Sequence, residues 1–199
     1  MRRIYLIRHG LPYFPGGGSY CIGQADFPLD PLGEEQARRM AEKLGGEKLT
    51  VFSSPLKRAY DTARALCESP LVIDELKEMH AGDWDGLSFE EIKKGWPELF
   101  EARGKNPELP LPNSEDWHEG QRRFISGVEK ALSRSRGSIA IVSHATVILS
   151  YICHVMGEET YKSLAWRPGY CGWYELELDE DGMRCIFPWQ SADRSENEN

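Results

Sequence analysis

Arginine and histidine side chains follow two short apolar segments of the sequence, residues 4–7 and 139–142. Arg8 and His9 come directly after the first segment, and His144 comes one serine after the second. An arginine guanidinium matches the oxygen atoms of a phosphoryl group. A neutral imidazole is a nucleophile that forms covalent intermediates. These residue types therefore indicate chemistry on a phosphoryl group.

A third segment adds another cation beside a helix start. Ser54 is typical of an N-cap and Pro55 of the first helical position, and Arg58 follows within one turn. Backbone N–H groups at a helix N-terminus also favour anions. If the two strands that precede the histidines are neighbours in a parallel sheet, two arginines and two histidines meet at one point and form a pocket for a dianion.

Cleavage of a phosphate ester also needs a general acid for the leaving oxygen. Residues 75–86 form an acidic loop punctuated by glycines. Partial burial beside the phosphate pocket would raise the pKa of a carboxyl in this loop and suit it to proton donation. The four candidates are Glu75, Glu78, Asp83 and Asp85.

These residues need elements that position them. The apolar, β-branched runs at 4–7 and 139–142 predict buried strands. In open α/β sheets, ligands bind at the carboxyl ends of the strands, where Arg8, His9 and His144 follow. We expect further strands at residues 49–52, 71–73, 173–178 and 183–187, and helices at residues 32–44, 55–67, 89–94, 97–102, 115–133 and 145–156.

Local signals suggest where several elements end. Asn113 or Ser114 is the expected N-cap of the helix at 115–133. Gly157 is expected to end the helix at 145–156. Asp181-Gly182 predicts a hairpin turn between the last two strands. Residues 11–31 are rich in glycine and proline and predict a long loop over the end of the first strand, a length that usually indicates a functional or a disordered loop.

Composition limits the class of protein and its partners. The 199 residues suffice for one domain, which we place at residues 1–189, and the polar residues 190–199 predict a disordered tail. Hydrophobic residues make up 40% of the chain, as in a soluble globular protein. The net charge of −8 disfavours nucleic acid and anionic membrane as partners, because both attract basic surfaces.

Cysteine usage and the N-terminus indicate a reducing compartment without metal chemistry. The five cysteines are odd in number and form no CxxC pair, which argues against a disulfide framework and a thiolate zinc site. There is no HExxH spacing, so we expect neither a metal nor a cofactor. The sequence shows no signal-peptide h-region and no apolar stretch of membrane-spanning length, which predicts a cytoplasmic protein.

Four motifs in the same order resemble the histidine phosphatase superfamily, which includes cofactor-dependent phosphoglycerate mutase. The resemblance covers residues 3–178 and implies an α/β fold, a three-layer α/β/α sandwich around a mostly parallel central sheet. The motifs are Arg8-His9-Gly10, the Ser-Pro-Leu-Lys-Arg-Ala-Tyr-Asp-Thr-Ala run at 54–63, Leu76-Lys77-Glu78 with Gly82-Asp83-Trp84-Asp85-Gly86, and Val142-Ser143-His144.

The resemblance implies a role for each core residue. His9 is the expected nucleophile that becomes phosphorylated, and Arg8, Arg58 and His144 are expected to hold the phosphoryl group. Glu78 is the expected proton donor, which later activates water. These roles describe a metal-independent phosphomonoesterase of the histidine acid-type phosphatase class.

Substrate contacts are expected from the glycine-rich loop and from the residues around the second histidine. Relatives have a Gly-x-x-Asp-x-Pro-Leu run that matches residues 23–29. The superfamily's usual Glu-Thr after the first motif is replaced by Leu-Pro, a nearby asparagine is absent, and Leu149 stands where arginine is frequent. The candidate substrate- and phosphate-binding residues are Gly23, Gln24, Ala145, which replaces a common glycine, Ser19, which could supply a missing polar contact, and His80, expected at the pocket mouth.

Several functions stay open. The 65 residues between Glu78 and His144 favour hydrolysis, because mutases of the superfamily are longer and carry an extra segment that closes the pocket. The expected partner is a small-molecule phosphate ester, with α-ribazole phosphate as one candidate, since residues 20–23, 75–79 and 170–173 are similar to α-ribazole-phosphate phosphatases. The alternatives are a phosphoglycerate mutase-type phosphotransferase, a non-catalytic module that binds phosphorylated ligands, and a phosphatase that docks a signalling protein. A homodimer is also open.

Overall fold

A central β-sheet organises the computed structural model, which describes residues 2–158, 166–180 and 182–191. Within these residues the strand order is β3-β2-β4-β1-β5-β6. The first four strands in this order are parallel, and β5 and β6 are antiparallel to their neighbours. The strands are β1 (Arg2–Arg8), β2 (Thr50–Ser53), β3 (Leu71–Val72), β4 (Ile139–Ser143), β5 (Trp173–Asp179) and β6 (Gly182–Gln190).

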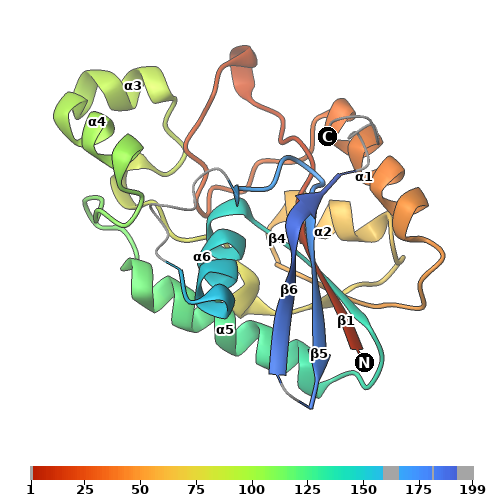
Figure 1. Cartoon of the computed structure of the whole chain (residues 1–199). Coiled ribbons are helices and arrows are strands. Elements are labelled where there is room, and N and C mark those ends of the chain that lie inside the picture. The colour runs from red at the N-terminus through yellow and green to blue at the C-terminus, as the bar shows by residue number, and fades with distance from the viewer. Residues whose placement is uncertain (1, 159–165, 181, 192–199) are drawn as a thin grey trace.

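Helices cover both faces of the sheet (Figure 1). Side chains of β1 alternate between the faces: Ile4 and Leu6 pack with α5 (Trp117–Ser133) and α6 (Ala145–Met156), while Tyr5 and Ile7 pack with α1 (Pro31–Leu44) and α2 (Lys57–Arg64). This alternation follows from the two-residue period of a strand, and burial of both faces explains why β1 and β4 carry the apolar runs 4–7 and 139–142. The predicted three-layer α/β/α sandwich is confirmed.

A helical pair stands apart from the two main layers. The helices α3 (Phe89–Gly95) and α4 (Pro97–Lys105) lie beyond the carboxyl ends of the parallel strands, next to the loop of residues 11–30 (Figure 1). Their apolar side chains join Trp84 and Leu111 in a separate core cluster. The pair therefore forms one wall beside the edge of the sheet where β1 and β4 end.

Two predicted helix starts are wrong, each for a physical reason of its own. Helix α2 begins at Lys57 rather than Pro55 and ends at Arg64, because the Ser54 side chain is engaged elsewhere and Leu56 has extended backbone angles. Helix α5 is capped by Asp116, whose carboxylate accepts hydrogen bonds from two N–H groups of the first turn. A carboxylate also complements the positive end of the helix dipole, which the predicted caps Asn113 and Ser114 would not do.

The C-terminal elements agree with the sequence in type but not in every boundary. Gly157 ends α6 with left-handed backbone angles, as expected. The β5–β6 hairpin is present, although Asp181 of the predicted turn lies outside the described residues. Gln190 is paired with Trp173 in the sheet, so the predicted tail is wrong at its first residue, and residues 192–199 lie outside the described part.

No helix in the described ranges is long and apolar enough to span a membrane. The assignment of residues 1–189 to one domain stays a prediction.

Candidate active site

The sheet brings the two predicted histidines together. Strands β1 and β4 are parallel neighbours with Arg8 aligned to Ser143, so His9 and His144 follow at the same edge. Their ring centroids are 5.1 Å apart. The prediction that these two strands lie side by side is confirmed, and it accounts for the meeting of residues that are far apart in sequence.

His9 is held as a neutral imidazole with a defined orientation. Its Nδ1 lies 2.7 Å from the Gly10 carbonyl oxygen, so Nδ1 carries the proton and donates it. Nε2 then accepts a hydrogen bond from Nε of Arg58 at 3.3 Å. Burial, followed by the charges of Arg58 and Arg8, holds the pKa of His9 well below its usual range. The lone pair of Nε2 is thus available near neutral pH.

Arg58 joins His9 to the glycine-rich loop. It lies in the first turn of α2 and is fully buried. Besides His9, its guanidinium donates to the carbonyl oxygens of Ala25 at 2.7 Å and Gly23 at 2.8 Å. Burial lowers the pKa of Arg58, and the carboxylate of Glu78 partly offsets this. The loop therefore contributes its carbonyl groups to fixing a cation next to the reactive nitrogen.

Arg8 supplies a second cation, which is partly buried and has an unused donor. Its guanidinium lies 3.9 Å from the centre of the Tyr170 ring and donates to the Pro168 carbonyl oxygen at 2.9 Å. Burial lowers the pKa of Arg8 to about 10. The Nε atom is buried and has no hydrogen-bond partner within the described residues. Because an unpaired buried donor is unfavourable, this atom suits an anionic ligand.

His144 is supported by a residue that the sequence analysis assigned elsewhere. Its Nε2 lies 2.9 Å from Oγ of Ser54, the predicted N-cap of α2. Its Nδ1 is buried without a partner in the described part of the chain. Burial and the nearby arginines hold the pKa of His144 well below its usual range. The position of Ser54 directly after β2, the neighbour of β4, was the available signal for this contact.

Among the four acidic candidates, Glu78 is the one that lines the cavity at His9. Its carboxylate accepts backbone N–H hydrogen bonds from Met79 at 2.9 Å, Thr146 at 3.0 Å and Val147 at 3.1 Å. The last two belong to the first turn of α6, so Glu78 caps this helix from outside and lies close to His144.

The other three carboxylates are engaged elsewhere. Glu75 forms an ion pair with Lys130, and Asp83 accepts a hydrogen bond from the Asn113 amide at 2.9 Å. Asp85 accepts the backbone N–H groups of Gln24 at 2.7 Å and Ala25 at 3.0 Å, which ties the acidic loop to the glycine-rich loop. These contacts explain why Glu78 alone of the four faces His9.

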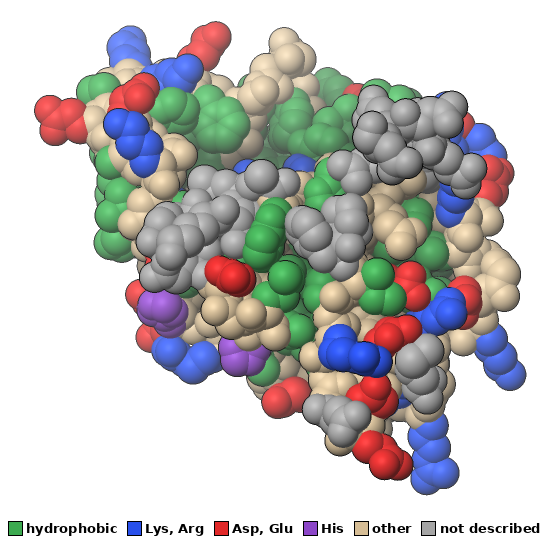
Figure 2. Space-filling model, in the orientation of Figure 1, with side chains coloured by type: hydrophobic (Ala, Val, Ile, Leu, Met, Phe, Trp, Pro, Cys, Tyr) green, Lys and Arg blue, Asp and Glu red, His purple; other side chains and the backbone are tan. Residues whose placement is uncertain are grey.

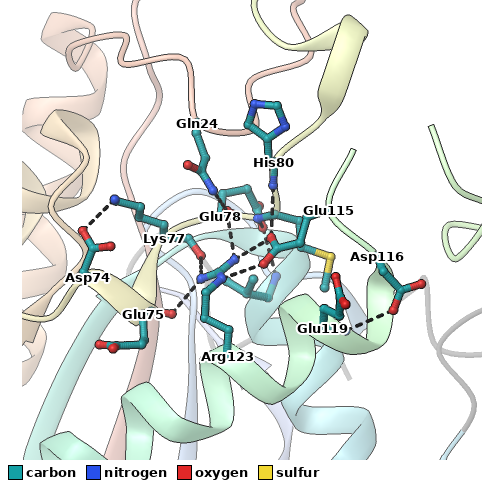
Figure 3. Close-up of polar contacts among 12 residues, drawn as sticks. Gln24, Asp74, Glu75, Lys77, Glu78, His80, Glu115, Asp116, Glu119 and Arg123 are labelled. Carbon is teal, nitrogen blue, oxygen red and sulfur yellow. Dashed lines mark hydrogen bonds and ion pairs between the residues drawn. The ribbon is translucent and has the colours of Figure 1, made fainter. Parts of the chain in front are cut away.

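Arg123, on α5, fixes the segment that carries Glu78 (Figure 3). It forms two hydrogen bonds of 2.7 Å with the carboxylate of Glu115. It also donates to the carbonyl oxygens of Glu75, Lys77 and Glu78 at 2.8, 2.9 and 3.2 Å. All five guanidinium N–H directions are used. Nothing in the sequence analysis singled out this residue, since its partners are more than forty positions away along the chain for three of the five bonds.

A cavity of about 520 Å³ opens beside His9. Arg8, Glu78 and His9 line it, whereas Arg58 and His144, which contact or adjoin His9, are fully buried and are not among its lining residues. Of the predicted substrate-binding residues, Ser19, Gly23, His80 and Ala145 line the cavity.

Gln24 is not among the lining residues. Its side chain donates to the Glu78 carbonyl oxygen at 3.1 Å (Figure 3). The predicted roles of all these residues stay predictions. Among the described residues there is no group of three or more His, Cys, Asp or Glu that could hold a metal ion.

Comparison with known families identifies the superfamily to which the chain belongs. A family model described as the histidine phosphatase superfamily (branch 1) matches residues 4–188. The chain belongs to the histidine phosphatase superfamily. It is 32% identical over 163 residues to a Hydrogenobacter thermophilus protein proposed to be phosphoserine phosphatase 2, which covers 79% of this chain and 80% of the relative.

Solved structures of the same superfamily are similar over nearly the whole chain. One is a mycobacterial glucosyl-3-phosphoglycerate phosphatase in complex with VO₃, with a TM-score of 0.82, 27% identity and coverage of 94% of this chain and 98% of that one. Another, from Escherichia coli K-12, is proposed to be an α-ribazole-5′-phosphate phosphatase, with a TM-score of 0.80, 26% identity and coverage of 95% and 96%. The three names share a phosphatase activity and differ in substrate. The comparisons therefore support a phosphatase and leave its substrate open.

Proposed function

We propose that this protein hydrolyses a small-molecule phosphomonoester through a phosphohistidine intermediate on His9. One observation carries the proposal: a neutral imidazole whose Nδ1 proton is bound by the Gly10 carbonyl, so that Nε2 bears a lone pair next to the guanidinium of Arg58 and within the electrostatic influence of Arg8. A nucleophile in this protonation state can attack phosphorus without first losing a proton.

In the first step, His9 Nε2 attacks the phosphorus atom. The N–P bond forms as the ester P–O bond breaks, and Glu78 transfers a proton to the leaving oxygen. Arg58 Nε already lies 3.3 Å from Nε2, so a phosphoryl group on that nitrogen would be next to it. The unpartnered Arg8 Nε is a further donor for phosphoryl oxygens, and His144 Nδ1 is another in the tautomer in which Ser54 Oγ donates to Nε2. These fixed charges stabilise the transition state without rearrangement.

In the second step, water attacks the phosphohistidine and Glu78 accepts a proton from it. The O–P bond forms, the N–P bond breaks, and inorganic phosphate leaves with His9 restored. Glu78 performs both proton transfers because it is the carboxyl of the acidic loop that lines the cavity. The buried arginines provide the positive charge that a metal ion provides in other phosphatases, which supports a metal-independent reaction.

Assays with a panel of phosphate esters are needed to identify the substrate, because the fold is shared by phosphatases with different substrates. Likeness to a proposed α-ribazole-5′-phosphate phosphatase supports α-ribazole phosphate as one candidate, and the curated relative supports phosphoserine as another. A phosphotransferase of the mutase type would share the first step and then return the phosphoryl group to an organic acceptor. Quantifying inorganic phosphate against the dephosphorylated product distinguishes the two.

The test is release of phosphate from an aryl phosphate in the presence of EDTA. We expect wild-type activity to survive EDTA and to disappear in His9→Ala. The matched control is His118→Ala, because His118 is exposed on α5 and does not line the cavity. Loss of wild-type activity on chelation, or activity retained in His9→Ala, would contradict the proposal. If the protein only binds phosphorylated ligands, then wild type, His9→Ala and His118→Ala would all release no phosphate.

A further inference from the structure

The cavity at His9 extends well beyond the space that a phosphoryl group requires. From Arg8 and His9 it continues between the glycine-rich loop and the helical pair α3–α4. Its volume of about 520 Å³ falls in the range typical of sites for whole small molecules. The part remote from His9 must therefore receive the leaving group, and its lining residues select that group.

The walls of this remote part are largely aromatic. Phe14 and Tyr20 contribute from the glycine-rich loop, where their rings stack with centroids 5.6 Å apart. Phe89 and Phe100 contribute from α3 and α4, with centroids 6.1 Å apart. Figure 2 shows hydrophobic side chains on both sides of the hollow between these elements. Such walls suit an apolar body in the leaving group.

Two further arginines line the same cavity. Arg103, on α4, is half-buried and forms no hydrogen bond or ion pair with any other described residue. Arg167 is held at its guanidinium by a 3.0 Å hydrogen bond to Oγ1 of Thr146, at the start of α6. Glu108 also lines this region, yet it forms no ion pair with Arg103.

The charges of these arginines act on one another. The charge of Arg167 lowers the pKa of Arg103 and also that of Arg8, and all three arginines line the same cavity. Burial is the main cause of the lowered pKa of Arg103. Arg8, Arg103 and Arg167 share the cavity lining with three carboxylates, those of Glu78, Glu108 and Glu115. Glu78 is bound by backbone N–H groups and Glu115 by Arg123, so neither of them neutralises Arg103 by direct contact. An anion placed beside Arg103 and Arg167 would reduce their mutual repulsion.

We propose that Arg103 and Arg167 bind a second anionic group, such as a carboxylate, at the end of the substrate remote from the transferred phosphoryl group. The substrate class is then a phosphomonoester whose leaving group has an apolar body and a terminal anion. This inference rests on the proposed phosphatase activity at His9, and it assigns Arg103 a role in specificity rather than in the chemical steps.

The experiment compares aryl phosphates that differ only in that terminal charge. The probes are para-carboxyphenyl phosphate and the longer para-(carboxyethyl)phenyl phosphate, each paired with its neutral carboxamide. For each pair, kcat/KM is measured with wild type, Arg103→Gln, Arg103→Lys and Lys105→Gln. Lys105→Gln is the matched control, because it removes a cation from the same helix but outside the cavity lining. Differences in the leaving-group pKa within a pair cancel when the ratio charged/neutral is compared between variants.

We expect wild type to prefer the charged member of at least one pair. Arg103→Gln should lower kcat/KM for that member about tenfold, mainly through KM, as for loss of one charge-assisted contact. It should leave the carboxamide unchanged, which shows that the variant is folded. Arg103→Lys should restore part of the preference, and Lys105→Gln should change neither member.

An unchanged ratio in Arg103→Gln, or equal losses for both members, would overturn the second-anion site while leaving the activity of His9 intact. Failure of the underlying function is distinguishable, because wild type would then hydrolyse neither the charged nor the neutral esters.

Discussion

At the scale of single residues, the site requires a neutral His9 next to arginines that stay charged. Burial removes water from all of them, which lowers the pKa of His9, Arg8 and Arg58. The imidazole responds by staying neutral, whereas an arginine whose pKa falls to about 10 is still a cation at neutral pH. The same environment therefore produces a nucleophile and the positive charge that its phosphorylated form needs.

Glu78→Gln tests the proton-transfer role. The amide cannot donate a proton as a carboxylic acid does, so kcat for an alkyl phosphate should fall by a factor of about 10² to 10⁴. An aryl phosphate with a nitrophenolate leaving group needs little protonation and should lose much less in its first step. Stopped-flow measurement of phenolate release and steady-state phosphate assays check this difference.

Asp83→Asn is the matched control for that variant. It lies in the same acidic loop but contacts Asn113 rather than the cavity, so both substrates should be hydrolysed as in wild type. Equal losses for the two substrates in Glu78→Gln would rule out a general-acid role for this residue.

At the scale of elements, the strand ends could be predicted from sequence and the contacts between loops could not. The apolar runs before His9 and His144 are local signals that predict two strands, and the structure shows that these strands are parallel neighbours. The hydrogen bond between Ser54 and His144 joins residues 90 positions apart, so Ser54 was interpreted as a cap from its local context alone. Arg123 likewise has no motif around it, and its function appears only once three carbonyl groups converge on it.

Arg123→Gln tests whether this convergence positions Glu78. The variant leaves Glu115 and three carbonyl groups with fewer partners, and a loss of about 2 kcal/mol in the free energy of unfolding is expected for this partly buried pair. Misplacement of Glu78 should also lower the ratio of alkyl to aryl phosphate hydrolysis, which a purely structural defect would not change. Chemical denaturation and initial rates measure the two effects.

Arg38→Gln provides the comparison, because Arg38 forms ion pairs on the exposed surface of α1. This substitution should lower the free energy of unfolding by less than about 1 kcal/mol. If Arg123→Gln lowers stability with an unchanged alkyl/aryl ratio, Arg123 is structural only.

Substitution of Gly23 tests whether the glycine-rich loop positions the site. A Cβ at this position would lie 2.6 Å from both the Ala81 nitrogen and the Met79 oxygen, which are backbone atoms that cannot move aside freely. Gly23→Ala should therefore displace the loop, weaken its contacts with Arg58, and reduce kcat/KM at least about tenfold.

Gly18→Ala is matched to it in the same loop, where the added Cβ would meet only a Tyr20 side-chain atom at 3.5 Å. We expect near-wild-type kinetics for Gly18→Ala. Comparable losses in Gly18→Ala and Gly23→Ala would show that the loop does not position the site.

At the scale of the whole molecule, the sandwich buries two histidines as neutral groups in a chain of net charge −8. The net negative charge of the chain does not attract phosphate esters, so the positive charge that binds the phosphoryl group must be local, and Arg58 and Arg8 provide it at His9. Parallel strands make this arrangement possible, because they direct the ends of β1, β2 and β4 to one edge.

This burial predicts how stability depends on pH. The pKa values of His9 and His144 are lowered in the folded state, while both return to about 6.5 on unfolding. Above that pH neither state binds these protons, and the stability is fully present. As the pH falls below it, the unfolded chain takes up protons that the folded chain does not, and the free energy of unfolding should decrease by about 1.4 kcal/mol per pH unit for each histidine.

Denaturant unfolding of wild type and His9→Gln between about pH 8 and pH 5 measures this slope. The variant should lose the contribution of one proton, so the two stability curves should converge as the pH falls. Parallel curves would show that His9 titrates alike in both states.

The most direct measurement is the mass of the protein quenched during turnover. Glu78→Gln is mixed with an aryl phosphate, denatured at alkaline pH to preserve phosphohistidine, and digested for peptide mass spectrometry. We expect the added mass of one phosphoryl group on the peptide containing His9, located on the His9 ring and absent from His9→Ala. A phosphoryl group on another residue, or turnover without any phosphorylated peptide, would contradict the central claim that His9 is the nucleophile.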